Sequence, residues 1–222
     1  MAKTVQKAKL TIAALQEEAI GFARTESRHA EPSLFGVTDG KAVGTYLEQK
    51  FRAHLRSRYT FREGNSAKGI DFPDIGVDIK VTSIRQPQSS CPFKSPRQMI
   101  FGLGYALLVF VYEKVDEAKR RTARLDIKHT IFVNADATGD YTMTRRLREM
   151  VADAANTDDI VAFLSDRNLP LDEVGLRELA REILTSPPRQ GYLTISNALQ
   201  WRLQYGQAIA EAGLAEGVLR LS

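Results

Sequence analysis

The stretch that decides the fold is GIDFPDIGVDIKVTS, residues 69–83. It places Asp71, Asp74 and Asp78 within eight residues, around a Pro-Asp-Ile-Gly sequence that is typical of a tight turn. Residues 77–83 alternate in polarity and are rich in β-branched side chains, a pattern that predicts a strand. We therefore expect the chain to fold back at the turn and to bring Asp71 opposite Asp78.

The three acids of this stretch are close enough to repel one another. Side chains alternate between the two faces of a strand, so Asp78 and Lys80 share one face and Ile79 takes the other. Two adjacent carboxylates are costly unless a positive charge lies between them, and Mg²⁺, which prefers oxygen ligands and keeps several waters, meets this need. A lysine beside such an ion can hold or activate an attacking water. In this interpretation Asp74 is only a turn residue.

A structural explanation competes with the catalytic one, because Asp78 and Lys80 also fit an exposed ion pair on an edge strand. The Asp-x-Lys pattern is not unique in this chain, since Asp126, Ile127 and Lys128 repeat it in another predicted strand. The second copy has no acid and turn just upstream, so we expect the first copy to carry any chemistry.

The rest of the chain predicts helices, then a run of strands, then helices. This order favours an α/β or α+β fold with a central mixed β-sheet flanked by helices and a helical C-terminal part. We expect one domain over residues 1–222, with a core at about 39–135 and a helical region at about 142–222. The predicted helices are 9–27, one starting at 39–40, 96–103, 142–155, 158–165, 172–185 and 195–211; the predicted strands are 59–62, 69–72, 77–83, 105–112 and 125–134, with a basic connection at 114–124 and a polar loop at 84–98.

Composition limits the class of protein. Its 222 residues, 43% of them hydrophobic, are enough to bury a core, and the single cysteine, Cys91, excludes an intrachain disulfide and fits a reducing compartment. The longest apolar stretch, residues 105–112, is too short for a membrane helix, and no secretory signal is evident, so we expect a cytoplasmic protein. Residues 41–100 hold eleven Lys and Arg against five Asp and Glu, an excess that attracts polyanions such as nucleic acid.

These residues resemble the signature of the PD-(D/E)XK nuclease superfamily, which includes most type II restriction endonucleases. DFPDIGVDIKVT is particularly similar to the D-F-P-x-L-G-[IV]-E-[LI]-K-T segment of the MutH-like subgroup, although Asp78 stands where that subgroup more often has Glu. Upstream, GKAVGTYLEQKF resembles the subgroup's helical segment and matches its acid to Glu48. The separation of Glu48 from Asp71 is longer than in that pattern, and Glu63 is a competing fourth acid.

The resemblance implies a restriction-endonuclease-like fold and Mg²⁺-dependent hydrolysis of double-stranded DNA that leaves 5′-phosphate ends. Asp71 and Asp78 would bind Mg²⁺ together with the backbone carbonyl of Ile79, Lys80 would orient or deprotonate the water, and Glu48 would reach the metal directly or through water. It also implies a homodimer on a palindromic site, with the cognate DNA methyltransferase as a separate protein.

DNA recognition is expected in the loop after the catalytic strand. Its side chains are of the donor and acceptor types that reach phosphates and base edges. The candidates are Arg85, Gln86, Gln88, Ser89, Ser90, Lys94 and Arg97.

Three alternatives remain open at the level of sequence. A MutH-like strand-nicking repair enzyme would carry the same motif. A non-catalytic regulator could read DNA through a helix-turn-helix made of residues 172–185 and 195–209, in which Trp201 and Tyr205 would share a helical face. A nuclease fold that processes RNA or damaged DNA is the third.

Overall fold

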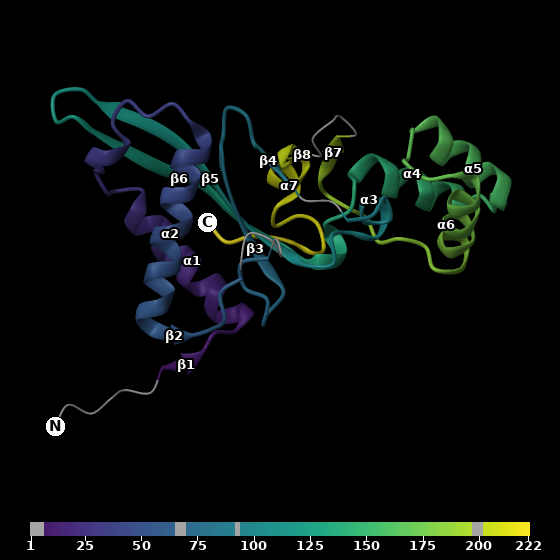
Figure 1. Cartoon of the computed structure of the whole chain (residues 1–222), viewed down its shortest axis with the longest axis horizontal. Coiled ribbons are helices and arrows are strands. Elements are labelled where there is room, and N and C mark those ends of the chain that lie inside the picture. Colours follow the sequence, from purple (N-terminus) through teal and green to yellow (C-terminus); the bar gives the residue numbers. More distant parts are fainter. Residues whose placement is uncertain (1–6, 65–69, 92–93, 197–201) are drawn as a thin grey trace. The chain divides into compact units, whose positions relative to one another are not determined.

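The computed structural model describes residues 7–64, 70–91, 94–196 and 202–222 (Figure 1). The chain divides into two compact units. The first unit comprises Met1–Pro87, Leu107–Phe132 and Leu219–Ser222, and the second comprises Gln88–Ala106 and Val133–Val218. The expectation of a single nuclease domain stays a prediction.

The first unit combines two long helices with a four-stranded sheet whose strand order is β3-β5-β6-β9. Helix α2 packs on strand β3 and on helix α1, and a two-residue parallel pairing joins β1 to β2. The elements of this unit are β1 Ala8–Lys9, α1 Ile12–Glu26, η1 Pro32–Leu34, α2 Gly40–Arg58, β2 Tyr59–Thr60, β3 Val77–Ser83, β5 Ala106–Glu117, β6 Thr122–Val133 and β9 Val218–Arg220.

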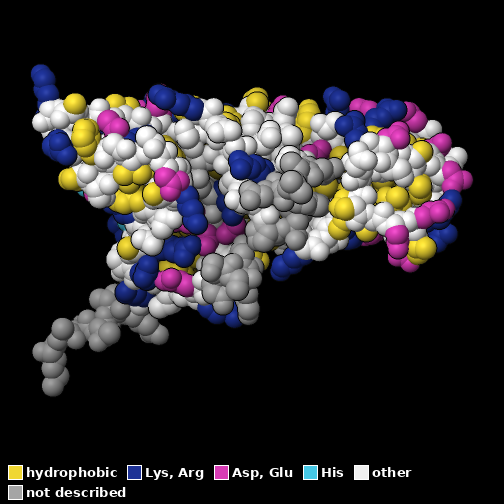
Figure 2. Space-filling view, turned by 45° about the horizontal axis from the view of Figure 1, so that its top comes forward, with side chains coloured by type: hydrophobic (Ala, Val, Ile, Leu, Met, Phe, Trp, Pro, Cys, Tyr) yellow, Lys and Arg dark blue, Asp and Glu magenta, His cyan; other side chains and the backbone are white. Residues whose placement is uncertain are grey.

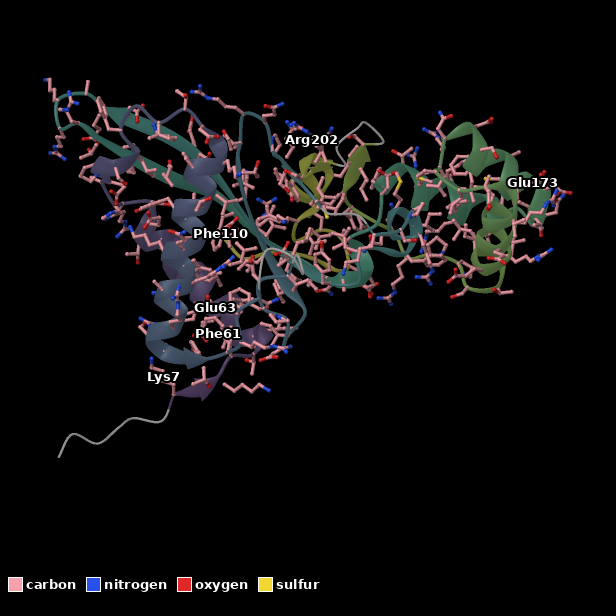
Figure 3. The ribbon with its side chains drawn as sticks, in the orientation of Figure 1. Lys7, Phe61, Glu63, Phe110, Glu173 and Arg202 are labelled. Carbon is pink, nitrogen blue, oxygen red and sulfur yellow. The ribbon has the colours of Figure 1, made fainter. Side chains whose placement is uncertain are left out.

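Three phenylalanines form the centre of the first unit's core. Phe22 of α1 and Phe51 of α2 have ring centroids 4.9 Å apart, and Phe110 of β5 meets Phe51 edge-on at 5.2 Å. Such tilted and edge-to-face contacts add to the stabilisation that burial provides. Phe110 is labelled in Figure 3, where it marks the point at which the helices cover the sheet. The core thereby fixes α2 against the sheet that carries β3.

The second unit contains a helical cluster and a small antiparallel sheet with strand order β4-β8-β7. Helix α6 packs against α4 and α5, and α3 packs against α4. The elements of this unit are β4 Gln88–Ser90, α3 Gln98–Phe101, η2 Ala135–Ala137, α4 Tyr141–Ala152, α5 Thr157–Asp166, α6 Glu173–Thr185, β7 Thr194–Ser196, β8 Arg202–Gln204 and α7 Gly206–Glu211.

A buried aspartate joins a helix to the small sheet. Asp140 caps α4 by accepting a hydrogen bond from the backbone N–H of Met143 at 2.9 Å. Its second oxygen accepts from the backbone N–H of Ile195 in β7 at 2.8 Å. Each bond to a buried carboxylate is stronger than a neutral one, so Asp140 holds β7 in a fixed position against α4.

The α+β fold predicted from the sequence is confirmed, but several segments differ from the prediction. The strand predicted at 69–72 is wrong in its described part, where Phe72 forms only an isolated bridge to Val77, and β4 lies inside the predicted loop at 84–98. The basic connection at 114–124 is wrong, because β5 continues to Glu117 and β6 begins at Thr122. The helix predicted at 195–211 is also wrong. Strand β7 ends at Ser196, strand β8 covers Arg202–Gln204, and α7 begins only at Gly206. Without that helix the helix-turn-helix alternative loses its reading element, and Trp201 lies outside the described residues.

No helix within the described ranges is long and apolar enough to cross a membrane.

The second unit depends on a close approach of two backbone segments, which Gly191 makes possible. A Cβ on Gly191 would lie 2.2 Å from the carbonyl oxygen of Gly139, far inside van der Waals contact. Gly191→Ala should therefore destabilise the protein by about 1–3 kcal/mol through overpacking. The matched control is Gly21→Ala, in the middle of α1 with no atom within 4 Å of the added Cβ. It should stabilise by roughly 0.5–1 kcal/mol. Urea unfolding of both variants measures the difference, and equal midpoints would contradict the packing described here.

Candidate active site

The turn after Asp71 brings two carboxylates together. The backbone N–H of Phe72 donates to the carbonyl of Val77 at 2.9 Å, and the two residues form an antiparallel bridge. In this register Asp71 lies opposite Asp78, as the sequence predicts. Gly76 closes the turn with φ of 62°, a left-handed conformation that favours glycine.

Asp71 is held on both of its oxygens. One accepts a hydrogen bond from the backbone N–H of Ile79 at 2.8 Å, so the carboxylate reaches across the hairpin to the strand that carries Asp78. The other forms an ion pair with the guanidinium of Arg52 on α2. This pair is only partly exposed, with side-chain exposures of 22% for Arg52 and 16% for Asp71. Asp71 is therefore positioned by the strand and the helix together.

Asp78 is buried, with 3% of its surface exposed. Its Oδ2 lies 2.8 Å from Nζ of Lys80, yet this oxygen accepts no hydrogen bond of regular geometry from the described residues. The ammonium thus compensates the charge without saturating the oxygen. Burial raises the pKa of Asp78 to about 7 despite the opposing effect of Lys80, and the Asp71 charge acts in the same direction as burial.

Glu48 completes the group from helix α2. Burial raises the pKa of this carboxyl, and the charge of Asp71 raises it further, whereas Arg52 and Lys80 lower it. All three of these charged neighbours belong to the group already described. The structure therefore brings Glu48, Asp71, Asp78 and Lys80 together, as expected from the sequence.

Glu63, the competing fourth acid, has a different environment. Its carboxylate pairs with Nε of Arg56 at 3.1 Å and remains 38% exposed. It does not figure among the charges that shift the pKa of Glu48 or Asp78. Figure 3 labels Glu63 beside Phe61, after the end of α2.

The second Asp-x-Lys sequence lacks the features of the first. Lys128 on β6 pairs with Asp126 at 2.7 Å and with Glu113 of β5 at 3.2 Å. The side chains are 36% and 35% exposed for Lys128 and Asp126, and they form an ordinary surface cluster. This copy is a natural control within the chain for experiments on Asp78 and Lys80.

The donor set of the site suits a hard divalent cation. Asp71 and Asp78 offer carboxylate oxygens, and the buried Oδ2 of Asp78 accepts no hydrogen bond of regular geometry from the described residues besides its ion pair with Lys80. The part of the chain that the structure describes contains no group of three or more His, Cys, Asp and Glu side chains arranged to hold a metal ion. An ion bound here would thus take its other ligands from the backbone, from water and from the substrate, as Mg²⁺ commonly does.

The loop residues predicted to bind DNA are spread over both units. Arg85 and Gln86 are exposed just after β3 in the first unit, and Lys94 is exposed in the second. Arg97 is engaged within the second unit by an ion pair with Glu182 of α6. The pair engages its Nε and Nη2, while the side chain stays 54% exposed.

Gln88 and Ser89 lie on strand β4 rather than in a loop. The hydroxyl of Ser89 hydrogen-bonds the hydroxyl of Tyr205, which is fully buried. Ser89 thus lies on the buried face of β4, where it contacts Tyr205, whereas Gln88 lies on the opposite face of the same strand.

Sequence reasoning missed Arg52, whose guanidinium holds Asp71. The only signal was its position four residues after Glu48, which places both side chains on one face of α2. That spacing says nothing about Asp71, because the partner comes from a different element of the fold.

Two adjacent carboxylates, a lysine on the same strand face and a third acid from a helix form a group that suits metal-assisted hydrolysis. Comparison with known proteins agrees with this class of reaction. Residues 9–220 match the family model described as Type II restriction enzyme NspV. The chain is 63% identical over 210 residues to the Type II restriction enzyme NspV of Nostoc sp. (strain ATCC 29411 / PCC 7524). The aligned residues cover 95% of this chain and 96% of the relative. This chain therefore belongs to the NspV family of type II restriction enzymes. No solved structure matches it.

The raised pKa of Asp78 predicts a pH-dependent cost in the metal-free protein. Between its ordinary value of 3.8 and about 7, the folded chain keeps a proton that the unfolded chain has lost, so stability falls as pH rises through this window. Asp78→Asn removes the charge, and it should raise the unfolding free energy relative to wild type by on the order of 2–4 kcal/mol at pH 8.

The advantage of Asp78→Asn should disappear below about pH 4, where both states of the wild type are protonated. Asp126→Asn, in the exposed second copy, should stay within about 0.5 kcal/mol of wild type at each pH. Chemical unfolding from pH 4 to 8 in EDTA measures both. A difference between Asp78→Asn and wild type that does not change with pH would contradict the assignment.

Proposed function

We propose that this protein is a type II restriction endonuclease that uses Mg²⁺ to hydrolyse phosphodiester bonds of double-stranded DNA at a specific sequence. Membership of the NspV family supports site-specific cleavage of DNA. The observation that carries the proposed chemistry is the buried Asp78, opposite Asp71 and 2.8 Å from Lys80. We place the chain in the PD-(D/E)XK superfamily on the same residues.

Asp71, Asp78 and the backbone carbonyl of Ile79 would hold the ion. When bound there, Mg²⁺ supplies a Lewis acid that stabilises the negative charge developing on the phosphate. Arg52 keeps one oxygen of Asp71 oriented, and the N–H of Ile79 keeps the other, so the carboxylate is fixed before substrate arrives. Preorganisation of this kind avoids a cost of rearrangement during the reaction.

Lys80 is the group that orients the attacking water. Its side chain is 16% exposed, and its ammonium lies 2.8 Å from Asp78 on the same face of β3. From there the ammonium donates a hydrogen bond that orients the water towards the phosphorus, and the water loses its proton to solvent. The bond between phosphorus and the 3′-oxygen then breaks and this oxygen takes a proton from solvent, which leaves 5′-phosphate and 3′-hydroxyl ends.

Glu48 acts as the fourth acid of the site. Its partly desolvated carboxyl faces the charges of Asp71 and Lys80, so it would support the ion by accepting a hydrogen bond from water. Arg52, one helical turn later, balances the added negative charge.

Double-strand cleavage of a palindrome would follow from a two-fold symmetric dimer, in which each copy cuts one strand. We propose this homodimer, a cytoplasmic location and a separate cognate methyltransferase as parts of the same function. The MutH-like alternative has the same residues but predicts nicks in one strand, so the two differ in the product rather than in the site.

Cleavage assays on plasmid or phage DNA test the chemistry. Wild type should give discrete bands in Mg²⁺ and none in EDTA, and Asp78→Ala and Lys80→Ala should lose at least about a hundredfold in rate because each removes a group that acts in the transition state. Lys128→Ala, in the second Asp-x-Lys copy, should cleave like wild type. Equal losses in Lys80→Ala and Lys128→Ala would contradict the site, and nicks alone would favour the MutH-like alternative.

A second comparison identifies the fourth acid. Glu48→Gln should slow cleavage roughly 10- to 100-fold at subsaturating Mg²⁺, since it removes a charge that supports the ligands of the ion. Glu63→Gln should remain within about twofold of wild type, because its carboxylate pairs with Arg56 outside the group. Single-turnover rates across a Mg²⁺ titration measure the loss in each variant. A larger loss in Glu63→Gln than in Glu48→Gln would assign the role of fourth acid to Glu63.

A further inference from the structure

The small sheet of the second unit presents a surface on which hydrogen-bonding side chains are set in rows. Its three strands are antiparallel, with β8 in the middle. The register aligns Gln88 with Gln204 and Thr194, Ser89 with Leu203 and Ile195, and Ser90 with Arg202 and Ser196. Because side chains alternate, the first and third rows share one face and the middle row takes the other.

The two faces of this sheet differ in character. On the inner face Leu203 and Ile195 are buried, and Ser89 bonds the buried Tyr205. The other face consists only of the two outer rows, and we call it the polar face: Gln88, Ser90, Thr194, Ser196, Arg202 and Gln204. It carries neither an acidic nor an apolar side chain.

Arg202 at the middle of this face has no carboxylate partner among the described residues, and it is exposed. Several other arginines of the second unit form ion pairs. Arg145 and Arg146 pair with Glu149, and Arg177 pairs with acids of α5 and α6. Figure 2 shows acidic and basic side chains intermingled at the α5–α6 end. A guanidinium without a carboxylate partner, beside hydroxyls and amides, suits an anionic ligand that also offers acceptors.

The polar face is supported rigidly. Asp140 fixes the backbone of Ile195 in β7 to the start of α4, and the Ser89–Tyr205 bond fixes β4 to the segment after β8. All three strands are thus anchored by their inner face or backbone. The outward side chains stand on a frame that need not rearrange on binding, which favours precise recognition.

The size and chemistry of the polar face match the edges of base pairs. Three strands about 4.8 Å apart and residues about 6.8 Å apart along a strand give a patch of roughly 10 by 7 Å, within the roughly 12 Å width of the DNA major groove. Arginine donates to O6 and N7 of guanine, and glutamine pairs with N6 and N7 of adenine. Serine and threonine accept or donate to either base.

We propose that the polar face reads the recognition sequence in the major groove, with Arg202 contacting guanine and Gln204 contacting adenine. This inference rests on the proposed function, since it names how that endonuclease selects its site. Hydrolysis and base recognition are then carried by different units of the chain: the acids and Lys80 in the first, and the polar face in the second. Figure 3 labels Arg202 at this sheet.

The test selects bound duplexes from a random pool, in Mg²⁺, with the cleavage-deficient Lys80→Ala chain as parent. The parent should enrich one sequence. Adding Arg202→Ala should abolish the preference at a guanine and lower affinity for the parent's sequence about 10- to 100-fold, with little change for unrelated duplexes. Adding Gln204→Ala should relax an adenine position. Arg177→Ala, an exposed arginine paired with Asp158 and Glu173, is the matched control and should leave the selected sequence unchanged.

Several results would overturn the proposal. An unchanged sequence in both the Arg202 and Gln204 variants would do so, as would failure of the parent to select any sequence. An equal weakening on every duplex, with the salt dependence reduced by about one charge, would make Arg202 a phosphate contact instead. Thermal unfolding shows whether Arg202→Ala is folded. If it is not, the sequences selected by Arg202→Lys and Gln204→Ala test the proposal instead. A wild type that cleaves nothing, while the parent still selects a sequence that depends on Arg202, would refute the proposed hydrolysis and leave the recognition in place.

Discussion

The burial of the Asp78 carboxylate opposite Asp71 is the constraint on which the site depends. Removing a carboxylate from water is unfavourable, and a second carboxylate beside it adds repulsion. The fold tolerates this because Arg52 pairs with Asp71 and Lys80 lies 2.8 Å from Asp78. The two positive charges are divided between a helix and a strand, so the packing of α2 on β3 is at once a structural and an electrostatic requirement.

The burial of these carboxylates lowers the stability of the folded protein, because their hydrogen bonds do not fully compensate for the loss of water. Oδ2 of Asp78 has no regular hydrogen bond within the described residues, although it is buried. An active site often gives up stability for chemistry, because a group that is fully satisfied in the resting state has little to gain from ligand or substrate. The exposed second copy, Asp126 and Lys128, has no such cost.

Much of the site could be predicted from sequence because its information is local. The Pro-Asp-Ile-Gly turn and the alternation of residues 77–83 fix the register, and the register alone puts Asp71 opposite Asp78. Arg52 could not be predicted, since its contact with Asp71 depends on how α2 packs. The outer part of β5, up to Glu117, was missed because it is mostly polar and has no buried face to reveal a strand. In β6 the part that was missed contains a single buried residue, Ala123.

The error at residues 195–211 has a different physical cause. Strands β7 and β8 are three residues long, and each contributes one buried side chain, Ile195 and Leu203. Eight residues apart, these two apolar positions also fit a helical period. Only the pairing of both strands in one sheet with β4, far away in sequence, resolves the ambiguity. The error matters for the proposed DNA recognition, because that sheet displays the polar face.

In the proposed site, a divalent ion would relieve the buried charge of Asp78. The most direct measurement is the thermal unfolding midpoint of wild type and Asp78→Asn, without DNA, across a Mg²⁺ titration at pH 8. Binding to the folded state alone raises the midpoint with ion concentration. We expect a rise that saturates in wild type and is absent in Asp78→Asn. An equal rise in both proteins would contradict it, since the ion would then bind elsewhere.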